Sequence, residues 1–148
     1  MRLFFGWNRA RWLACILVLG IPSAAGAQQL ARVISVSEVR LKPGGDAEVY
    51  SYRNKMEEFF DLTRAEGLLA DAVAECALSA WRALGCRDAG RIDIRCDAQG
   101  APAFIECNPL AGLRPGFSDL PILAEQAGMN YDALIGAILA EASARVAK

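Results

Sequence analysis

The chain has 148 residues, with 16 basic and 17 acidic side chains and a formal net charge of −1. Hydrophobic residues make up 54% and charged residues 22%, which is typical of one globular domain and excludes a highly charged, disordered chain. The sequence contains no histidine, which excludes His-dependent catalytic triads and His-ligated metals. It has no basic, aromatic-interleaved patch of the kind that binds nucleic acid.

The first 27 residues have the pattern of a secretory signal peptide. A basic beginning is followed by an apolar run over residues 12–21 and by small residues at 25–27, which offer a cleavage site. The run is shorter than the roughly 20 apolar residues that a membrane-spanning helix requires. This pattern predicts a leader over residues 1–27, one domain over residues 28–148, and a periplasmic or secreted location.

Beyond the leader, hydrophobic periodicity predicts both strands and helices. The last two helices have Asp119 and Asn130 as predicted N-caps. The predicted elements are a strand over residues 31–39 and helices over residues 68–84, 121–126 and 131–146. Together with the hairpin described next, they indicate an α+β fold in which a mixed or antiparallel sheet has helices packed on one face.

Two more strands are predicted over residues 91–96 and 101–107, on either side of a turn at 97–100. If these four residues form the loop, Cys96 faces Ala101, and Asp93 lies diagonally across from Glu106. Side chains alternate between the faces of a strand, so one face of this hairpin is apolar and the other is polar. The polar face carries Arg91, Asp93, Arg95, Phe104 and Glu106, with Asn108 just beyond.

Two carboxylates and an amide on one face suit a hard cation such as Mg²⁺, which takes oxygen ligands from one or two carboxylates and from substrate phosphates. Asp93 and Glu106 would be the carboxylate ligands, and Asn108 would add a neutral oxygen. Arg91 would hold an anionic oxygen in a two-pronged fork. The alternative is a solvated polar face on which Arg91 and Glu106 form a surface ion pair of little energetic consequence.

Four cysteines lie beyond the leader, and none of them belongs to a C-x-x-C pair. This spacing disfavours a structural zinc site. Cys96 and Cys107 fall on the apolar face of the hairpin, so we predict buried thiols rather than a disulfide framework.

A series of motifs surrounds the hairpin. A helix ends in small residues, residues 90–93 read Gly-Arg-x-Asp, residues 106–108 read Glu-x-Asn, and Gly112 lies in the loop that follows. In this order the motifs resemble the C-terminal part of D-alanine–D-alanine ligases, within the ATP-grasp superfamily. A weaker likeness is the aromatic-flanked segment ending in Lys55, so the resemblance extends from about residue 31 to the C-terminus.

The resemblance implies ATP-dependent joining of a carboxylate to an amine through an acyl phosphate. It implies that Asp93, Glu106 and Asn108 bind Mg²⁺ or Mn²⁺ and bridge the phosphates of ATP. It also implies that Arg91 stabilises charge on the reacting acyl phosphate and that Lys55 contacts phosphates. The implied partners are a nucleotide and a small amino-acid-like or peptide-like substrate.

Members of the family often hold the terminal carboxylate of the substrate with a serine in the loop after Glu-x-Asn. Gly112 and Ser118 are the candidates in this chain, although the loop departs from the usual pattern. ATP-grasp enzymes also hold the nucleotide between two lobes, and the resemblance covers the second half of that unit. We therefore expect the N-terminal lobe to come from another chain.

Two alternatives remain open at this stage. The chain is either part of an active ligase or a non-catalytic fragment, exported or not, that keeps the fold and metal binding. A small secreted binding module is a third class, which rests on the leader alone. A ligase that uses ATP belongs in the cytoplasm, whereas the leader indicates export. The beginning of the chain therefore reflects either a genuine export signal or a truncation, a rearrangement or a wrongly assigned gene start.

Overall fold

A computed structural model of the chain describes residues 12–18, 31–46, 51–97 and 99–146, with backbone alone for 12–18 and 145. The elements in chain order are the strands and helices β1 (Trp12–Val18), β2 (Arg32–Leu41), α1 (Tyr52–Met56), β3 (Phe60–Arg64), α2 (Leu68–Ala83), β4 (Ala89–Cys96), β5 (Pro102–Asn108), α3 (Asp119–Gln126) and α4 (Tyr131–Val146). The fold is α+β, as predicted, and none of the described helices is long and apolar enough to cross a membrane.

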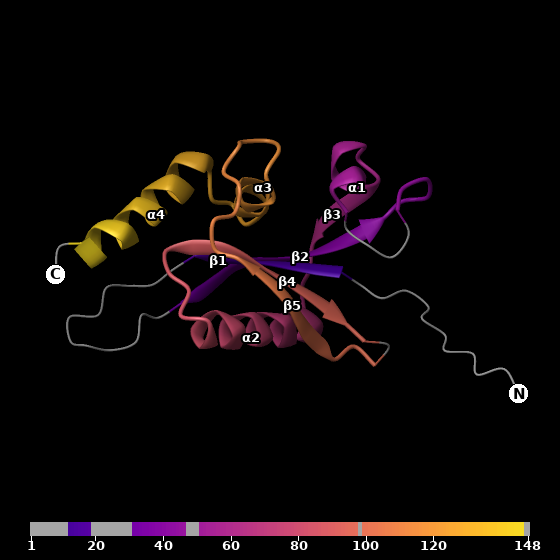
Figure 1. Ribbon diagram of the computed structural model, residues 1–148, viewed down its shortest axis with the longest axis horizontal. Coiled ribbons are helices and arrows are strands. Elements are labelled where there is room, and N and C mark those ends of the chain that lie inside the picture. Colours follow the sequence, from indigo (N-terminus) through magenta and orange to yellow (C-terminus); the bar gives the residue numbers. More distant parts are fainter. Residues whose placement is uncertain (1–11, 19–30, 47–50, 98, 147–148) are drawn as a thin grey trace, which may run out of the picture.

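The strands form one sheet in the order β3-β2-β1-β4-β5, and every pairing in it is antiparallel. β1 occupies the centre and pairs with β2 along one edge and with β4 along the other (Figure 1). Part of the apolar run predicted as the core of a leader therefore lies in the central strand. A short apolar run is typical of a buried strand as well as of a leader, and periodicity alone does not separate them. Residues 1–11 and 19–27 lie outside the described residues.

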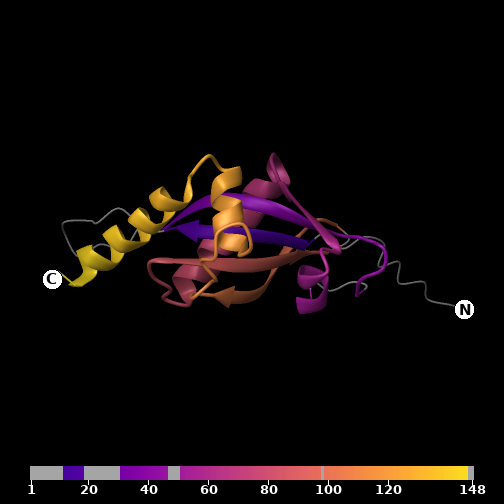
Figure 2. The ribbon, with the colours of Figure 1, turned by 90° about the horizontal axis from the view of Figure 1, so that it is seen from above.

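Helices cover both faces of the sheet, not one face as predicted. Figure 1 shows α2 on one side and α1, α3 and α4 on the other, and Figure 2 shows α3 crossing above the strands. The reason lies in β2, where five consecutive residues from Ser35 to Val39 are buried. A strand buried at consecutive positions has both faces covered. Val36 packs in the core beneath α2, and Val39 packs in the core beneath α3.

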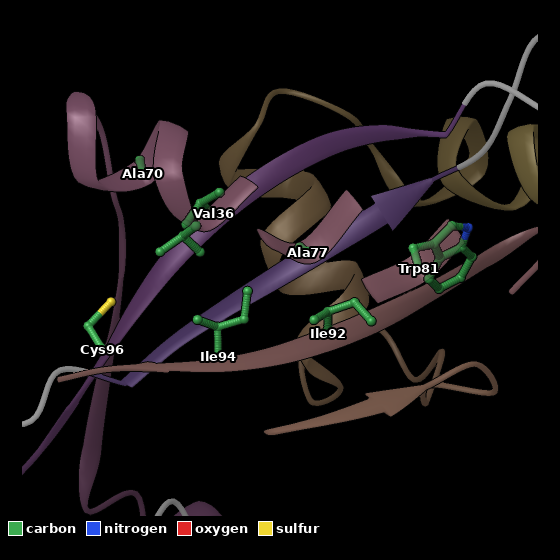
Figure 3. Close-up of a cluster of buried hydrophobic side chains, with 8 residues drawn as sticks. Val36, Ala70, Ala77, Trp81, Ile92, Ile94 and Cys96 are labelled. Atoms are coloured by element: carbon green, nitrogen blue, oxygen red, sulfur yellow. The ribbon is translucent and has the colours of Figure 1, made fainter. Parts of the chain in front are cut away.

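The larger core lies between α2 and the sheet. Figure 3 shows Trp81 of α2 pointing at Ile92 of β4, and both side chains are fully buried, as is Ile94. Trp81 also approaches Gly90, where an added Cβ would lie 2.8 Å from the indole ring and 2.7 Å from the Asn108 carbonyl oxygen. The glycine of the Gly-Arg-x-Asp motif is therefore required by close packing. Trp81 belongs to the core beneath α2.

The second core lies under α3 and α4. Leu120 and Leu123 of α3 and Leu134 of α4 are buried there against Val39. α4 has the predicted bounds, and Asn130 Oδ1 accepts the Ala133 N–H at 2.8 Å, as expected of an N-cap.

α3 differs from the prediction at its beginning. It starts at Asp119 with Ser118 in the N-cap position, so the predicted cap residue lies inside the first turn. Asp119 is the first helical residue, and its carboxylate is directed to partners on other elements. A carboxylate in the first turn also complements the helix dipole.

Candidate functional site

The hairpin of β4 and β5 contains the predicted polar face, in a different register from the one expected. The structure pairs Arg91 with Asn108, Asp93 with Glu106, Ile94 with Phe104 and Cys96 with Pro102. The register shifts between Asp93 and Ile94, where the chain forms a bulge, and the turn is longer than predicted. Asp97 lengthens the turn because its Oδ1 accepts the N–H groups of Gln99 at 2.9 Å and Ala101 at 2.8 Å.

This register brings the two carboxylates closer than the prediction did. Directly opposed residues in an antiparallel pair lie about 4.5–5.5 Å apart, whereas diagonal ones lie about 7–8 Å apart. Asp93 is directly opposed to Glu106, so the bulge places both acids at one rung of the ladder. The prediction that Phe104 shares their face is wrong, since Phe104 lies opposite the buried Ile94.

Arg91 is the centre of the charged groups on this face. Its Nε donates to Asp93 Oδ1 at 2.7 Å and its Nη2 to Asp93 Oδ2 at 2.8 Å, which is the paired geometry of a guanidinium and a carboxylate. Nη2 also lies 3.6 Å from Glu106 Oε1, and Nη1 donates to Asp119 Oδ2. Arg91 is only 15% exposed, whereas Glu106 is 59% exposed, so the acid at the outer edge of the site faces solvent.

Lys55 reaches the same site from α1. Its Nζ donates to Asp119 Oδ1 at 2.7 Å, and the ring of Phe117 lies 5.6 Å from it. Asp119 therefore binds Lys55 with one oxygen and Arg91 with the other. These contacts bring three separate segments of the chain to one point, namely α1, β4 and the beginning of α3.

The position of Lys55 depends on its neighbour Asn54, which is fully buried. Asn54 Oδ1 accepts the Asp46 N–H at 2.7 Å, and its Nδ2 donates to the Asp46 carbonyl at 2.9 Å. Ser51 caps the short helix by accepting the Asn54 N–H at 3.1 Å. An added Cβ at Gly45 would lie 2.1 Å from Asn54 Oδ1, so this contact also requires glycine at position 45. These bonds fix a helix that is too short to be stable by itself.

Burial raises the pKa of the Asp93 carboxyl above its usual value, and the charge and hydrogen bonding of Glu106 act in the same direction. The hydrogen bonds and charge of Arg91 oppose this rise and offset part of it. A carboxylate whose ionisation is disfavoured by burial and by a neighbouring acid forms a place where a divalent cation would be favourable.

The oxygen donors of this face fit a Mg²⁺ or Mn²⁺ ion. Each carboxylate oxygen of Asp93 accepts one hydrogen bond from Arg91 and has a second lone pair for a ligand. Glu106 and Asn108 lie on the neighbouring strand β5. No group of three or more acidic, histidine or cysteine side chains that could hold an ion occurs among the described residues. An ion at Asp93 and Glu106 would therefore complete its shell with the Asn108 amide, phosphate oxygens and water.

The predicted substrate loop is held together by the two residues singled out in it. Ser118 Oγ accepts the Arg114 N–H at 3.1 Å, and an added Cβ at Gly112 would lie 2.7 Å from the same hydroxyl. Ser118 is buried, and its hydroxyl closes the loop. The Arg114 guanidinium lies 4.8 Å from the Phe117 ring, on the loop that leads to Asp119.

Cys107 lies between Glu106 and Asn108 and faces Ile92 on the neighbouring strand. Its Sγ is 3.4 Å from the Cys86 Sγ, and no disulfide joins the cysteines that the structure describes beyond the central strand. Burial is the main cause that raises the pKa of the Cys107 thiol to about 12, and the neighbouring Cys86 contributes. This thiol stays protonated at neutral pH behind the charged face.

The structure brings Lys55, Arg91, Asp93 and Glu106 into one network. Gly112 and Ser118 lie together in the adjoining loop. Asp119 was not predicted as a site residue, because its side chain has the pattern of a helix cap. Asn54 was not predicted either, and its only sequence signal is its place directly before Lys55 in the aromatic-flanked segment. Burial of a carboxylate is decided by contacts with distant segments, so no local pattern reveals it.

Comparison with known protein families gives an independent view of these residues. The family model described as D-ala D-ala ligase C-terminus matches residues 22–140, which include the whole candidate site. The D-alanine–D-alanine ligase of Bordetella petrii is 32% identical over 132 residues, covering 88% of this chain and 38% of the relative. The corresponding ligase of Bordetella pertussis is 36% identical over 128 residues, with 82% and 38% covered.

Solved structures show the same fold. The D-alanine–D-alanine ligase of Bacillus anthracis, in a crystal structure complexed with ATP, superimposes with a TM-score of 0.65 at 23% identity. The match covers 95% of this chain and 41% of that one. The chain thus spans about two fifths of the length of the proteins that it resembles, at their C-terminal part.

Proposed function

Because this chain belongs to the family of D-alanine–D-alanine ligase C-terminal domains, we propose that it is the part of an ATP-grasp ligase that binds ATP together with Mg²⁺ or Mn²⁺. The observation that carries the proposal is the meeting of two opposed carboxylates, Asp93 and Glu106, with two cations, Arg91 and Lys55. A nucleotide with its metal ion needs both kinds of group, because its phosphates are anionic and the ion between them is cationic.

The acids and cations have separate tasks in this proposal. Asp93, Glu106 and Asn108 would hold the ion, which neutralises phosphate charge and orients the phosphate oxygens when it is bound. Arg91, fixed by Asp93 and Asp119, would stabilise negative charge that develops on the acyl phosphate. Lys55 would contact a phosphate oxygen.

Preorganisation supports these roles. The Arg91 guanidinium is held at both oxygens of Asp93, and the chain next to Lys55 is fixed by the buried Asn54. Donors that are already in place need little reorganisation when charge builds up. Phosphoryl transfer depends mainly on such positioning and charge neutralisation and requires no protein nucleophile.

We propose that the substrates are a carboxylate and an amine of the amino-acid or peptide class, and that the rest of the catalytic unit is supplied by another polypeptide. The alternative is a non-catalytic domain that keeps the fold and the metal site. Use of ATP would place the protein in the cytoplasm.

Thermal stability measured with and without Mg·ATP tests the proposal. A ligand that binds only the folded state raises stability by about 1.4 kcal/mol at ten times its Kd, which corresponds to a rise of a few degrees in Tm. We expect this rise with Mg·ATP and its absence when the metal is chelated. No change at millimolar Mg·ATP would contradict nucleotide binding by this chain.

Substitution of the acids locates the site. Asp93→Asn and Glu106→Gln should abolish the Mg·ATP shift while the chain remains folded. Asp61→Asn is the matched control, because Asp61 also lies on a strand and pairs with Lys42 at 2.9 Å, but it is exposed and its strand β3 does not pair with β4 or β5. An unchanged Tm shift with Mg·ATP in Asp93→Asn would favour the alternative, in which the polar face of the hairpin is solvated and binds no metal ion.

A further inference from the structure

A buried carboxylate joins the two cations of the candidate site. Asp119 is 4% exposed, and its two oxygens accept hydrogen bonds from Lys55 Nζ and Arg91 Nη1. Lys55 lies 64 residues before Asp119 in the sequence and Arg91 lies 28 residues before it. Asp119 therefore pairs with both cations, one through each carboxylate oxygen.

Two cations in a half-buried site repel each other, and the repulsion grows as water is excluded. Lys55 is 21% exposed and Arg91 is 15% exposed, so neither is fully screened by solvent. A carboxylate placed between them removes the repulsion and fixes both side chains at once. Since Asp119 begins α3, whose Leu120 and Leu123 are buried in the second core, the carboxylate itself is held by packing.

We propose that Asp119 is a positioning residue, which holds Lys55 and Arg91 side by side as a single receptor for the phosphates of ATP. The inference rests on the proposed function, since the receptor needs a nucleotide to receive. Asp119 itself does not touch the nucleotide. It acts through the two cations, and Phe117, two residues before it in sequence, covers Lys55 with its ring.

An opposite role is conceivable on electrostatic grounds, and it predicts the opposite result. If Asp119 merely occupied the cations, it would compete with the phosphates, and its removal would tighten nucleotide binding. If Asp119 positions them, its removal weakens binding even though the site loses a negative charge. The sign of the change in affinity therefore separates the two roles.

The first measurement needs no nucleotide. Acylation of lysine amines, followed by peptide mapping, reports how accessible Lys55 is, with Lys42 as a second lysine in the same sample. In Asp119→Asn we expect Lys55 to react on the order of tenfold faster, since it loses one charge-assisted hydrogen bond. Asp61→Asn removes the partner of Lys42 and should leave Lys55 unchanged. Equal Lys55 rates in Asp119→Asn and the parent chain would overturn the proposal.

The second measurement is the Kd of Mg·ATP by calorimetry for the same variants. We expect Asp119→Asn to weaken binding on the order of tenfold and Asp119→Glu, which keeps the charge, to recover part of the loss. Unchanged or tighter binding in a folded Asp119→Asn chain would overturn the proposal. A purely structural Asp119 would lower Tm and leave the Kd unaltered.

The two measurements separate failure of the proposed nucleotide binding from failure of the role proposed for Asp119. If the parent chain does not bind Mg·ATP, the proposed function fails, and the Lys55 acylation rate still decides whether Asp119 positions the lysine. If Asp119→Asn does not fold, Asp119→Glu takes its place. Its carboxylate is displaced by one methylene, so Lys55 should react faster than in the parent chain, and a rate equal to that of the parent chain together with an equal Kd would overturn the proposal.

Discussion

The two faces of β4 differ in what holds them together. Toward α2, Ile92 and Ile94 are fully buried among apolar side chains. Toward α1 and α3, Arg91 and Asp93 are buried to a lesser degree and are held by ion pairs. One strand thus builds the core with its even-numbered residues and the candidate site with its odd-numbered ones. The difference teaches that stability and ligand binding can be altered separately at neighbouring positions.

Trp81→Ala should have the largest effect on stability. It removes the largest fully buried side chain of the α2 core and leaves a cavity against Gly90 and Ile92. We expect the free energy of unfolding to fall by about 3–5 kcal/mol. Urea denaturation measures the loss. A change below about 1 kcal/mol would show that the α2 face does not dominate stability.

Arg91→Met should have the next largest effect and should act on both properties. It leaves Asp93 and Asp119, both largely buried, without their guanidinium partner. Breaking such a pair is destabilising, and we expect about 2–3 kcal/mol in the same urea experiment, together with loss of the Mg·ATP shift. Retained nucleotide binding in this variant would show that Arg91 is not part of the binding site.

The Cys107 thiol should make stability fall at high pH. Its folded pKa, raised to about 12 by burial, lies above the unfolded value, so the unfolded chain releases the proton first. The stabilisation is complete below the unfolded pKa and is lost as the pH rises through the interval up to the folded pKa. Screening at this half-buried thiol reduces the effect to about 0.5–1 kcal/mol at pH 10.

Comparison with Cys107→Ala isolates this thiol from lysines and tyrosines that titrate in the same range. The difference in unfolding free energy between the two chains should shrink as the pH rises from 8 to 10. A constant difference would show that the thiol ionises as readily in the folded chain as in the unfolded one.

Asp61→Asn should have the smallest effect. The Lys42–Asp61 pair spans 2.9 Å, but both side chains are well exposed, so the pair resembles those of the site in geometry and differs from them in burial. Exposed pairs contribute about 0–1 kcal/mol. A loss as large as that of Arg91→Met would mean that burial is not what makes the site pairs important.

The helices α2 and α4 and the existence of the hairpin could be predicted because their signals are local. The apolar spacing of α2 and the Asn130 cap of α4 gave bounds within one residue of those observed. The register of the hairpin could not be predicted, since the bulge after Asp93 and the hydrogen bonds of Asp97 add residues that the alternation pattern does not reveal.

The acids and cations of the site were predicted as separate residues, but their assembly was not. Asp119 has the pattern of a cap residue, and its contact with Lys55 joins segments that are 64 residues apart. The presence of helices on both faces of the sheet was also not predicted. Ser37 and Glu38 of β2 have the pattern of solvent-facing residues, although both are buried in the structure. Long-range burial of polar side chains is decided by tertiary packing.

The central place of β1 has a consequence for the beginning of the chain. Cleavage after Ala27 would remove the strand that pairs with both β2 and β4, and would leave two separate ribbons, β3-β2 and β4-β5, with newly unpaired edges. Two-stranded ribbons are marginal in water, and unpaired edges promote aggregation. Proteolytic maturation and assembly of this sheet therefore exclude each other, and the intact mass of the isolated protein reveals which of them a given molecule has undergone.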